Sequence, residues 1–144
     1  CEIDGISFLA RMIEGNYPDY EAVVPRNNDK IAIVDKNLLI ASLKRVSVLS
    51  RERQNAVKTE WDKDLLIISS SDPEIGEATD EIIVDYQGEP FIIGFNARYL
   101  IEALERITSE KAKITMSEPD KAVYITDANA TSFVYECVVM PLRL

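Results

Sequence analysis

The chain has 144 residues, of which 47% are apolar, and it carries 25 acidic against 16 basic residues, a formal net charge of −9. This acidic balance argues against a protein that grips nucleic acid over its whole surface, because phosphate would be repelled. Histidine is absent, which excludes the commonest general base, the commonest transition-metal ligand and every nucleophile pair that depends on imidazole.

The first 24 residues are expected to hold one strand and a connector. Residues 6–15 (ISFLARMIEG) are typical of a strand, and residues 16–25 (NYPDYEAVVP) of an extended linker. Pro18 and Pro25 support the linker, because each proline keeps the residue before it out of the helical conformation. The chain does not begin with methionine, so we expect a piece of a longer protein whose preceding domain ends in this strand.

Two later segments share one pattern and indicate an internal duplication. Residues 31–46 (IAIVDKNLLIASLKRV) and 91–107 (FIIGFNARYLIEALERI) each run from a short β-rich stretch through Asp35 or Asn96 into an amphipathic stretch. Asp and Asn are favoured N-caps because their side-chain oxygen accepts a backbone N–H of the first helical turn. A shift of 61 residues superimposes four apolar positions at helical spacing: Leu39 on Leu100, Ile40 on Ile101, Leu43 on Leu104 and Val46 on Ile107.

Each predicted helix is followed by stretches of alternating polar and apolar residues, which indicate strands. The six stretches are residues 55–61, 64–70 and 80–86 in the first copy and 111–117, 122–127 and 132–140 in the second. The unit is therefore strand, helix and three strands, and it occurs twice, at about residues 30–84 and 90–142. Neither helix could bury its apolar stripe alone, so we predict one α+β domain over residues 25–144, with two helices packed against antiparallel sheets.

Charge is unevenly distributed along the chain. Residues 36–53 contain five basic residues and one acid, whereas residues 72–89 contain seven acids and no base. The basic stretch is typical of a solvated helix face, and it also suits a face turned towards phosphate. Val48 falls on the polar side of this helix next to Leu49, which indicates a contact between chains.

The two cysteines and the clustered acids give no motif for a metal or a disulfide framework. Cys1 and Cys137 lack ligand spacing, so neither a four-ligand zinc site nor a set of disulfides is predicted, and a reducing cytoplasm fits best. A carboxylate- or metal-dependent enzyme could use the acids of residues 62–64 or 72–77. Their spacing matches no calcium-binding loop, and we predict neither a metal nor a cofactor.

Three segments resemble the bacterial DNA polymerase III β subunit, the sliding clamp: residues 13–25 (IEGNYPDYEAVVP), 94–100 (GFNARYL) and 138–144 (VVMPLRL). The resemblance covers nearly the whole chain, as the end of the middle domain (residues 1–24) followed by the C-terminal domain (25–144). It implies the DNA clamp fold and a non-catalytic processivity subunit in the cytoplasm. In this family two subunits close head to tail into a ring of six similar domains around duplex DNA, with helices lining the hole.

The resemblance also implies a hydrophobic groove for linear peptides of replicative and translesion polymerases, the clamp loader and mismatch-repair proteins. The groove positions are Pro18, Val23, Asn96, Tyr99, Val138, Met140, Pro141, Leu142 and Arg143. Each also has a structural interpretation: residues of a last strand belong partly to the core, and Asn96 serves as an N-cap. The chain departs from the family pattern at Ala22, Gln54 and Asp120, so we expect a different peptide preference.

The same resemblance assigns two further surfaces. Facing the DNA are Lys44, Arg45, Arg51 and Arg98. At the contact between subunits are Val48, Leu49, Glu74, Glu77, Asp80 and Glu81. The alternative function is a free-standing peptide-binding adaptor without a DNA role, which would form no ring.

Overall fold

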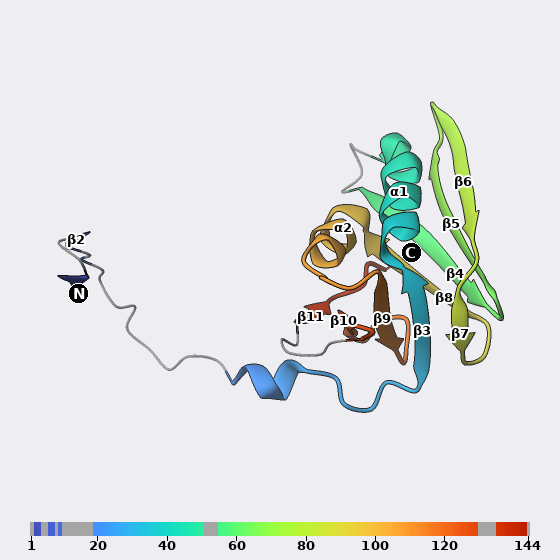
Figure 1. The fold of residues 1–144 in the computed structure, drawn as a ribbon. Coiled ribbons are helices and arrows are strands. Elements are labelled where there is room, and N and C mark those ends of the chain that lie inside the picture. The colour runs from blue at the N-terminus through green and yellow to red at the C-terminus, as the bar shows by residue number, and fades with distance from the viewer. Residues whose placement is uncertain are drawn as a thin grey trace.

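The structure is a computed structural model that describes residues 2–3, 6–7, 9, 19–50, 55–129 and 135–143 (Figure 1). At the N-terminus β1 (Glu2–Ile3) pairs antiparallel with β2 (Ile6–Ser7). Most of the predicted strand at residues 6–15 lies outside the described residues.

The connector differs from the extended linker that the prolines predict. It contains a short 3₁₀ helix, η1 (Tyr20–Val23), capped by Asp19, whose carboxylate accepts the backbone N–H of Glu21 at 3.1 Å. The residues on either side of this helix, Asp19 and Val24, have the predicted extended conformation, and Val24 lies directly before Pro25. A proline restrains only the residue directly before it, so a helical turn that ends two residues before Pro25 can still form.

The predicted duplication is present, with four strands after the helix in the first copy and three in the second among the described residues. The first copy consists of β3 (Lys30–Asp35), α1 (Lys36–Val46), η2 (Ser47–Ser50), β4 (Ala56–Asp62), β5 (Leu65–Asp72), β6 (Gly76–Ile82) and β7 (Asp85–Gln87). The second consists of β8 (Phe91–Asn96), α2 (Ala97–Glu105), β9 (Lys111–Met116), β10 (Val123–Asp127) and β11 (Glu136–Val139).

The predicted strand at residues 80–86 is two strands in two different sheets, which corrects the sequence analysis. Ile82, Val84 and Tyr86 are all buried, so the alternation continues without a break. However, β6 pairs with β5, whereas β7 crosses to pair with β3. Alternation shows which face a residue occupies and carries no information about its pairing partner.

The two copies exchange their first strands. One sheet has the order β11-β10-β9-β3-β7 and the other β6-β5-β4-β8. Thus β3 of the first copy completes the sheet of the second, and β8 of the second completes the sheet of the first, both antiparallel. The two copies therefore share one core and form a single unit.

Both helices begin at the predicted caps. The side chain of Asp35 accepts the N–H of Leu38 at 2.9 Å, and that of Asn96 accepts the N–H of Arg98 at 3.0 Å. Each helix buries an apolar stripe: Leu39, Leu43 and Val46 on α1, and Leu100, Ala103 and Leu104 on α2. Each leucine so buried contributes about 1.5–3 kcal/mol relative to an exposed one.

The two helices lie against each other, with α1 also along β5 and β6 (Figure 1). Lys44 and Glu105 are equivalent under the 61-residue shift, yet they face each other across this contact, with Nζ 3.0 Å from Oε1. Two equivalent positions meet only near the axis that relates the copies. The pseudo-twofold axis therefore passes between α1 and α2 beside this ion pair.

Candidate functional site

The C-terminal segment belongs partly to the core and partly to the surface. On β11 the side chain of Val139 is buried, whereas Met140, directly after the strand, is 62% exposed. The chain then crosses to the other sheet, where the N–H of Leu142 donates to the carbonyl of Gly94 on β8 at 2.8 Å. The terminus thus fastens two sheets together and presents a methionine beside them.

A cavity of about 530 Å³ lies between α2 and β11. Its lining consists of Tyr99, Glu102, Ala103, Glu105, Arg106, Tyr135, Cys137, Val138, Val139 and Met140. Tyr99 is 57% exposed, so this cavity combines a large exposed aromatic side chain with an exposed methionine. Both are suited to an apolar ligand, because methionine adapts its shape and tyrosine adds a hydroxyl to a broad apolar surface.

The structure brings together three of the predicted groove residues, Tyr99, Val138 and Met140, in the lining of this cavity, which contains none of the other predicted groove residues that the structure describes. Asn96 caps α2, Pro141 and Leu142 are half-buried, and Val23 is exposed on η1. Arg143 lines a different cavity, of about 590 Å³, over β4 and β5. Pro18 lies outside the described residues, as does Gln54, one of the positions where the chain departs from the family pattern.

Sequence analysis missed two polar groups that line the cavity beside β11, Arg106 and Tyr135. Burial raises the pKa of the Tyr135 phenol to about 12, with the neighbouring Cys137 adding to the rise and the Arg106 charge opposing it. Arg106 could have been found from the repeat, because the 61-residue shift places it on Arg45. Tyr135 gave no comparable signal.

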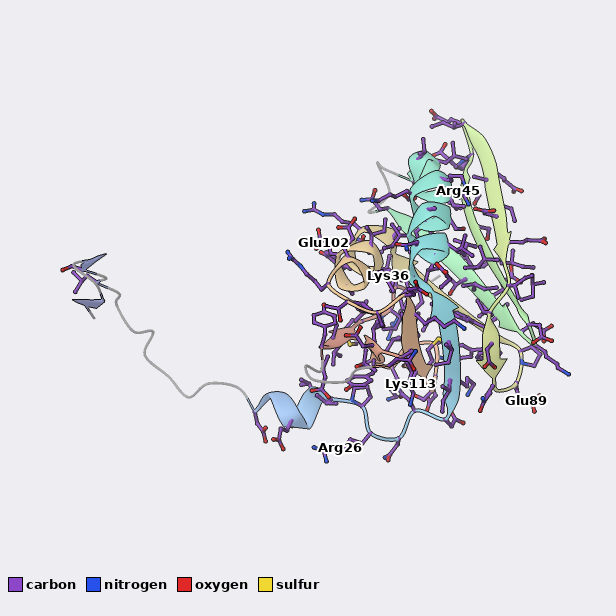
Figure 2. All side chains as sticks on the ribbon, viewed as in Figure 1. Arg26, Lys36, Arg45, Glu89, Glu102 and Lys113 are labelled. Atoms are coloured by element: carbon purple, nitrogen blue, oxygen red, sulfur yellow. The ribbon has the colours of Figure 1, made fainter. Side chains whose placement is uncertain are left out.

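The cations expected to face DNA are all engaged in ion pairs where the structure describes them. Lys44 pairs with Glu105, and Nε of Arg98 lies 2.8 Å from Glu102 Oε1 on the same helix. Arg45 donates from Nε to Asp80 Oδ2 at 3.0 Å, and Figure 2 shows Arg45 on the side of α1 that faces β6. Arg51 lies outside the described residues.

Asp80 is the acidic partner of Arg45 and one of the residues expected at the subunit contact. Burial opposes ionisation of its carboxyl, but the hydrogen bond and charge of the Arg45 guanidinium hold the pKa of Asp80 below its usual range. Arg45, which was expected to face DNA, therefore forms an ion pair with Asp80, which was expected at the subunit contact.

Comparison with known proteins decides the family. The family described as "DNA polymerase III beta subunit, C-terminal domain" matches residues 21–143 of the chain. The chain belongs to this family. The beta sliding clamp of Caulobacter vibrioides is 34% identical over 143 residues, which are 99% of this chain and 38% of that protein.

Solved structures agree with the family in fold. A sliding clamp of Pseudomonas aeruginosa bound to griselimycin has a TM-score of 0.84 and 34% identity, covering 91% of this chain and 35% of the other. A Caulobacter crescentus beta sliding clamp has a TM-score of 0.86 and 36% identity, covering 92% and 35%. The predicted family and the α+β clamp fold are confirmed, and the chain spans little more than a third of these relatives.

The residues expected at the clamp's subunit contact gather at one edge of the molecule. Val48 is 52% exposed on η2, and η2 packs against β6, the edge strand of its sheet. Glu77, Asp80 and Glu81 lie on β6, and Glu74 lies in the turn before it. Val48 and Leu49 on η2 thus lie beside an acidic edge strand, and their role in a contact between subunits stays a prediction.

The described residues show neither a metal site nor a membrane segment. Among them no three of the possible ligands Cys, Asp and Glu come close enough together to hold an ion. No helix within the described ranges is long and apolar enough to cross a bilayer.

Proposed function

We propose that the chain is the C-terminal part of a replicative sliding clamp. This clamp is a ring-shaped, non-catalytic processivity factor that encircles duplex DNA in the cytoplasm and tethers polymerases, the clamp loader and repair proteins. Residues 1–24 are the end of its middle domain and the connector, and residues 25–144 are its C-terminal domain. In the full-length protein two subunits join head to tail, and no cofactor or metal takes part.

The observation that carries this proposal is the cavity between α2 and β11, in a chain whose family match runs over residues 21–143. The cavity offers Tyr99 and Met140 as exposed apolar contacts. Two buried anchor side chains of a peptide would contribute about 1.5–3 kcal/mol each. Together they supply about 3–6 kcal/mol before the cost of ordering the peptide, so the micromolar affinity that we expect, about −8 kcal/mol, requires further contacts of the peptide beside the two anchors. Partners of that strength exchange readily.

The ion pairs on the helices support a protein that slides on DNA and does not grip it. Each phosphate contact adds affinity that salt screens and that slows movement along the duplex. Lys44, Arg45 and Arg98 are each balanced by a carboxylate, which leaves little net positive charge on this face. A closed ring needs no strong phosphate contact, because its topology keeps it on the duplex.

The groove is tested by titrating the chain with a fluorescent peptide of the pattern Gln-Leu-x-Leu-Phe. Met140→Lys places a second positive charge in the cavity that Arg106 lines, and we expect it to weaken binding at least about tenfold, since an unpaired charge must be desolvated there. Ile83→Lys is the matched control, because Ile83 is also an exposed apolar residue (82%) and lies outside the cavity lining. A chain ending at Val139 should lose binding as well. Equal affinity of all four proteins would contradict the proposed groove.

A further inference from the structure

The two copies of the repeat have different residues at one equivalent position on their edge strands, β6 in the first copy and β11 in the second. Ala32 and Ile93 are equivalent under the 61-residue shift. From Ile93 the paired residues across one sheet are Thr59, Ile68 and Asp80. From Ala32 the paired residues across the other sheet are Ile114, Ile125 and Cys137. Cys137 therefore occupies in the second copy the place that Asp80 has in the first.

The same shift places Arg106, at the end of α2, on Arg45 of α1. In the first copy Arg45 and Asp80 bond to each other and link the helix to the edge strand. In the second copy Arg106 and Cys137 line the cavity between α2 and β11. The second copy therefore has an arginine equivalent to Arg45, but a cysteine in the place of Asp80 on its edge strand.

No neighbouring carboxylate compensates for this loss within the described part of the chain. Glu102 and Glu105 also line the cavity, but they pair with Arg98 and Lys44 respectively. The guanidinium of Arg106 makes no ion pair or hydrogen bond with the described residues. The cavity lining thus contains apolar contacts, two carboxylates that pair with cations outside the lining, and Arg106, which has no ion-pair partner among the described residues.

We propose that Arg106 selects clamp-binding peptides that carry a carboxylate to one side of their apolar anchors. The peptide's Asp or Glu would bond the guanidinium as Asp80 bonds Arg45 in the first copy. The planar, forked donors of arginine suit a carboxylate, and Tyr99, Val138 and Met140 supply apolar contacts in the same cavity. This inference rests on the proposed function, because it requires that peptides dock between α2 and β11.

The test is a glutamate scan of the fluorescent peptide, in which each position outside the apolar anchors carries Glu or Gln in turn. We expect one Glu peptide to bind the chain about three- to fivefold more tightly than its Gln counterpart, the size typical of a partly exposed ion pair. The preference should disappear in Arg106→Gln and decrease as salt is raised. Lys121→Gln removes a charge from an exposed residue on the turn before β10, outside the cavity lining, and should leave the preference unchanged.

The outcomes separate this inference from the proposed function. Peptides that bind with no preference for Glu, or whose preference survives in Arg106→Gln, overturn the role of Arg106 and leave the groove in place. The role is also overturned if Arg106→Gln weakens Glu and Gln peptides equally, because the arginine then only supports the shape of the cavity. If no peptide binds the unmodified chain, the proposed groove itself is wrong.

Discussion

At the scale of single residues, Asp127 is the buried acid of the described part of the chain, with 5% of its surface exposed. Its Oδ1 accepts the backbone N–H groups of Thr108 at 3.0 Å and Ser109 at 2.9 Å, and the Ser109 hydroxyl at 2.8 Å. Burial opposes ionisation, but these donors from Ser109 and Thr108 outweigh it and hold the pKa of Asp127 below its usual range. Asp127 thereby fixes the loop that leads from α2 into β9, next to the cavity.

Replacing Asp127 with Asn should destabilise the chain by about 1.5–3 kcal/mol, because the hydrogen bonds lose their charged acceptor and the amide NH2 that replaces the buried, unpartnered Oδ2 finds no acceptor. Urea unfolding at neutral pH measures the difference. Asp120→Asn, at an exposed position in a turn, is the control and should change stability by less than about 0.5 kcal/mol.

The destabilisation caused by Asp127→Asn should depend on pH. Since the folded-state pKa of Asp127 lies below its unfolded value of 3.8, its contribution to stability is complete above that value. The contribution decreases below it and is lost as the pH falls through the folded-state pKa. Unfolding of both proteins at a series of pH values from neutral to about 3 checks this. A stability difference that stays constant over this range would show that the charge of Asp127 is unimportant.

At the scale of elements, the contact between α1 and α2 depends partly on a charge difference between the copies. Lys44 and Glu105 are both about half-exposed, so we expect a coupling free energy of about 0.2–1 kcal/mol. Lys44→Glu alone should destabilise the chain, and adding Glu105→Lys should restore most of the loss. A double-mutant cycle followed by thermal unfolding measures the coupling, and additive effects of the two substitutions would exclude it.

The sequence predicted local elements well because their signals are local. Asp35 and Asn96 mark the starts of α1 and α2, and the apolar spacing after each predicts the buried stripe. What could not be predicted is which strand pairs with which. The exchange of β3 and β8 and the crossing of β7 depend on pairing between distant segments. The alternation of residues within a strand does not predict such pairing.

The candidate site was predicted less completely than the fold. Tyr99, Val138 and Met140 come from the resemblance, and the cavity unites them. Arg106 was missed, because the family motifs do not include it and its meaning emerges only when the strand registers show Cys137 in the place of Asp80. That an ion pair joins Arg45 to Asp80 also required the fold, since they lie on α1 and β6.

At the scale of the whole molecule, the exposed edge beside Val48 is the place to test assembly. In the full-length protein Val48→Asp should leave the clamp monomeric, because a carboxylate would be buried against apolar residues of the neighbouring subunit. Leu38→Asp is a control of equal exposure, 54% against 52%, and should leave a dimer. Sedimentation distinguishes the two states. A dimer of the Val48→Asp protein would show that the subunits meet elsewhere, and a monomer before any substitution would favour the adaptor without a ring.

The exchanged strands also determine how this chain can acquire its structure. Asp35 pairs with Lys111, more than 70 residues away, and Ala56 pairs with Asn96. A nascent chain therefore cannot complete the sheet of β4, β5 and β6 until β8 has left the ribosome, and it cannot complete the other sheet until β11 has followed. Bringing such distant segments together costs loop entropy before any contact forms, which places folding in the slow range of milliseconds to seconds. If the chain were cut between β7 and β8, each half would lack a strand of its sheet, and it could complete that sheet only by binding the other half.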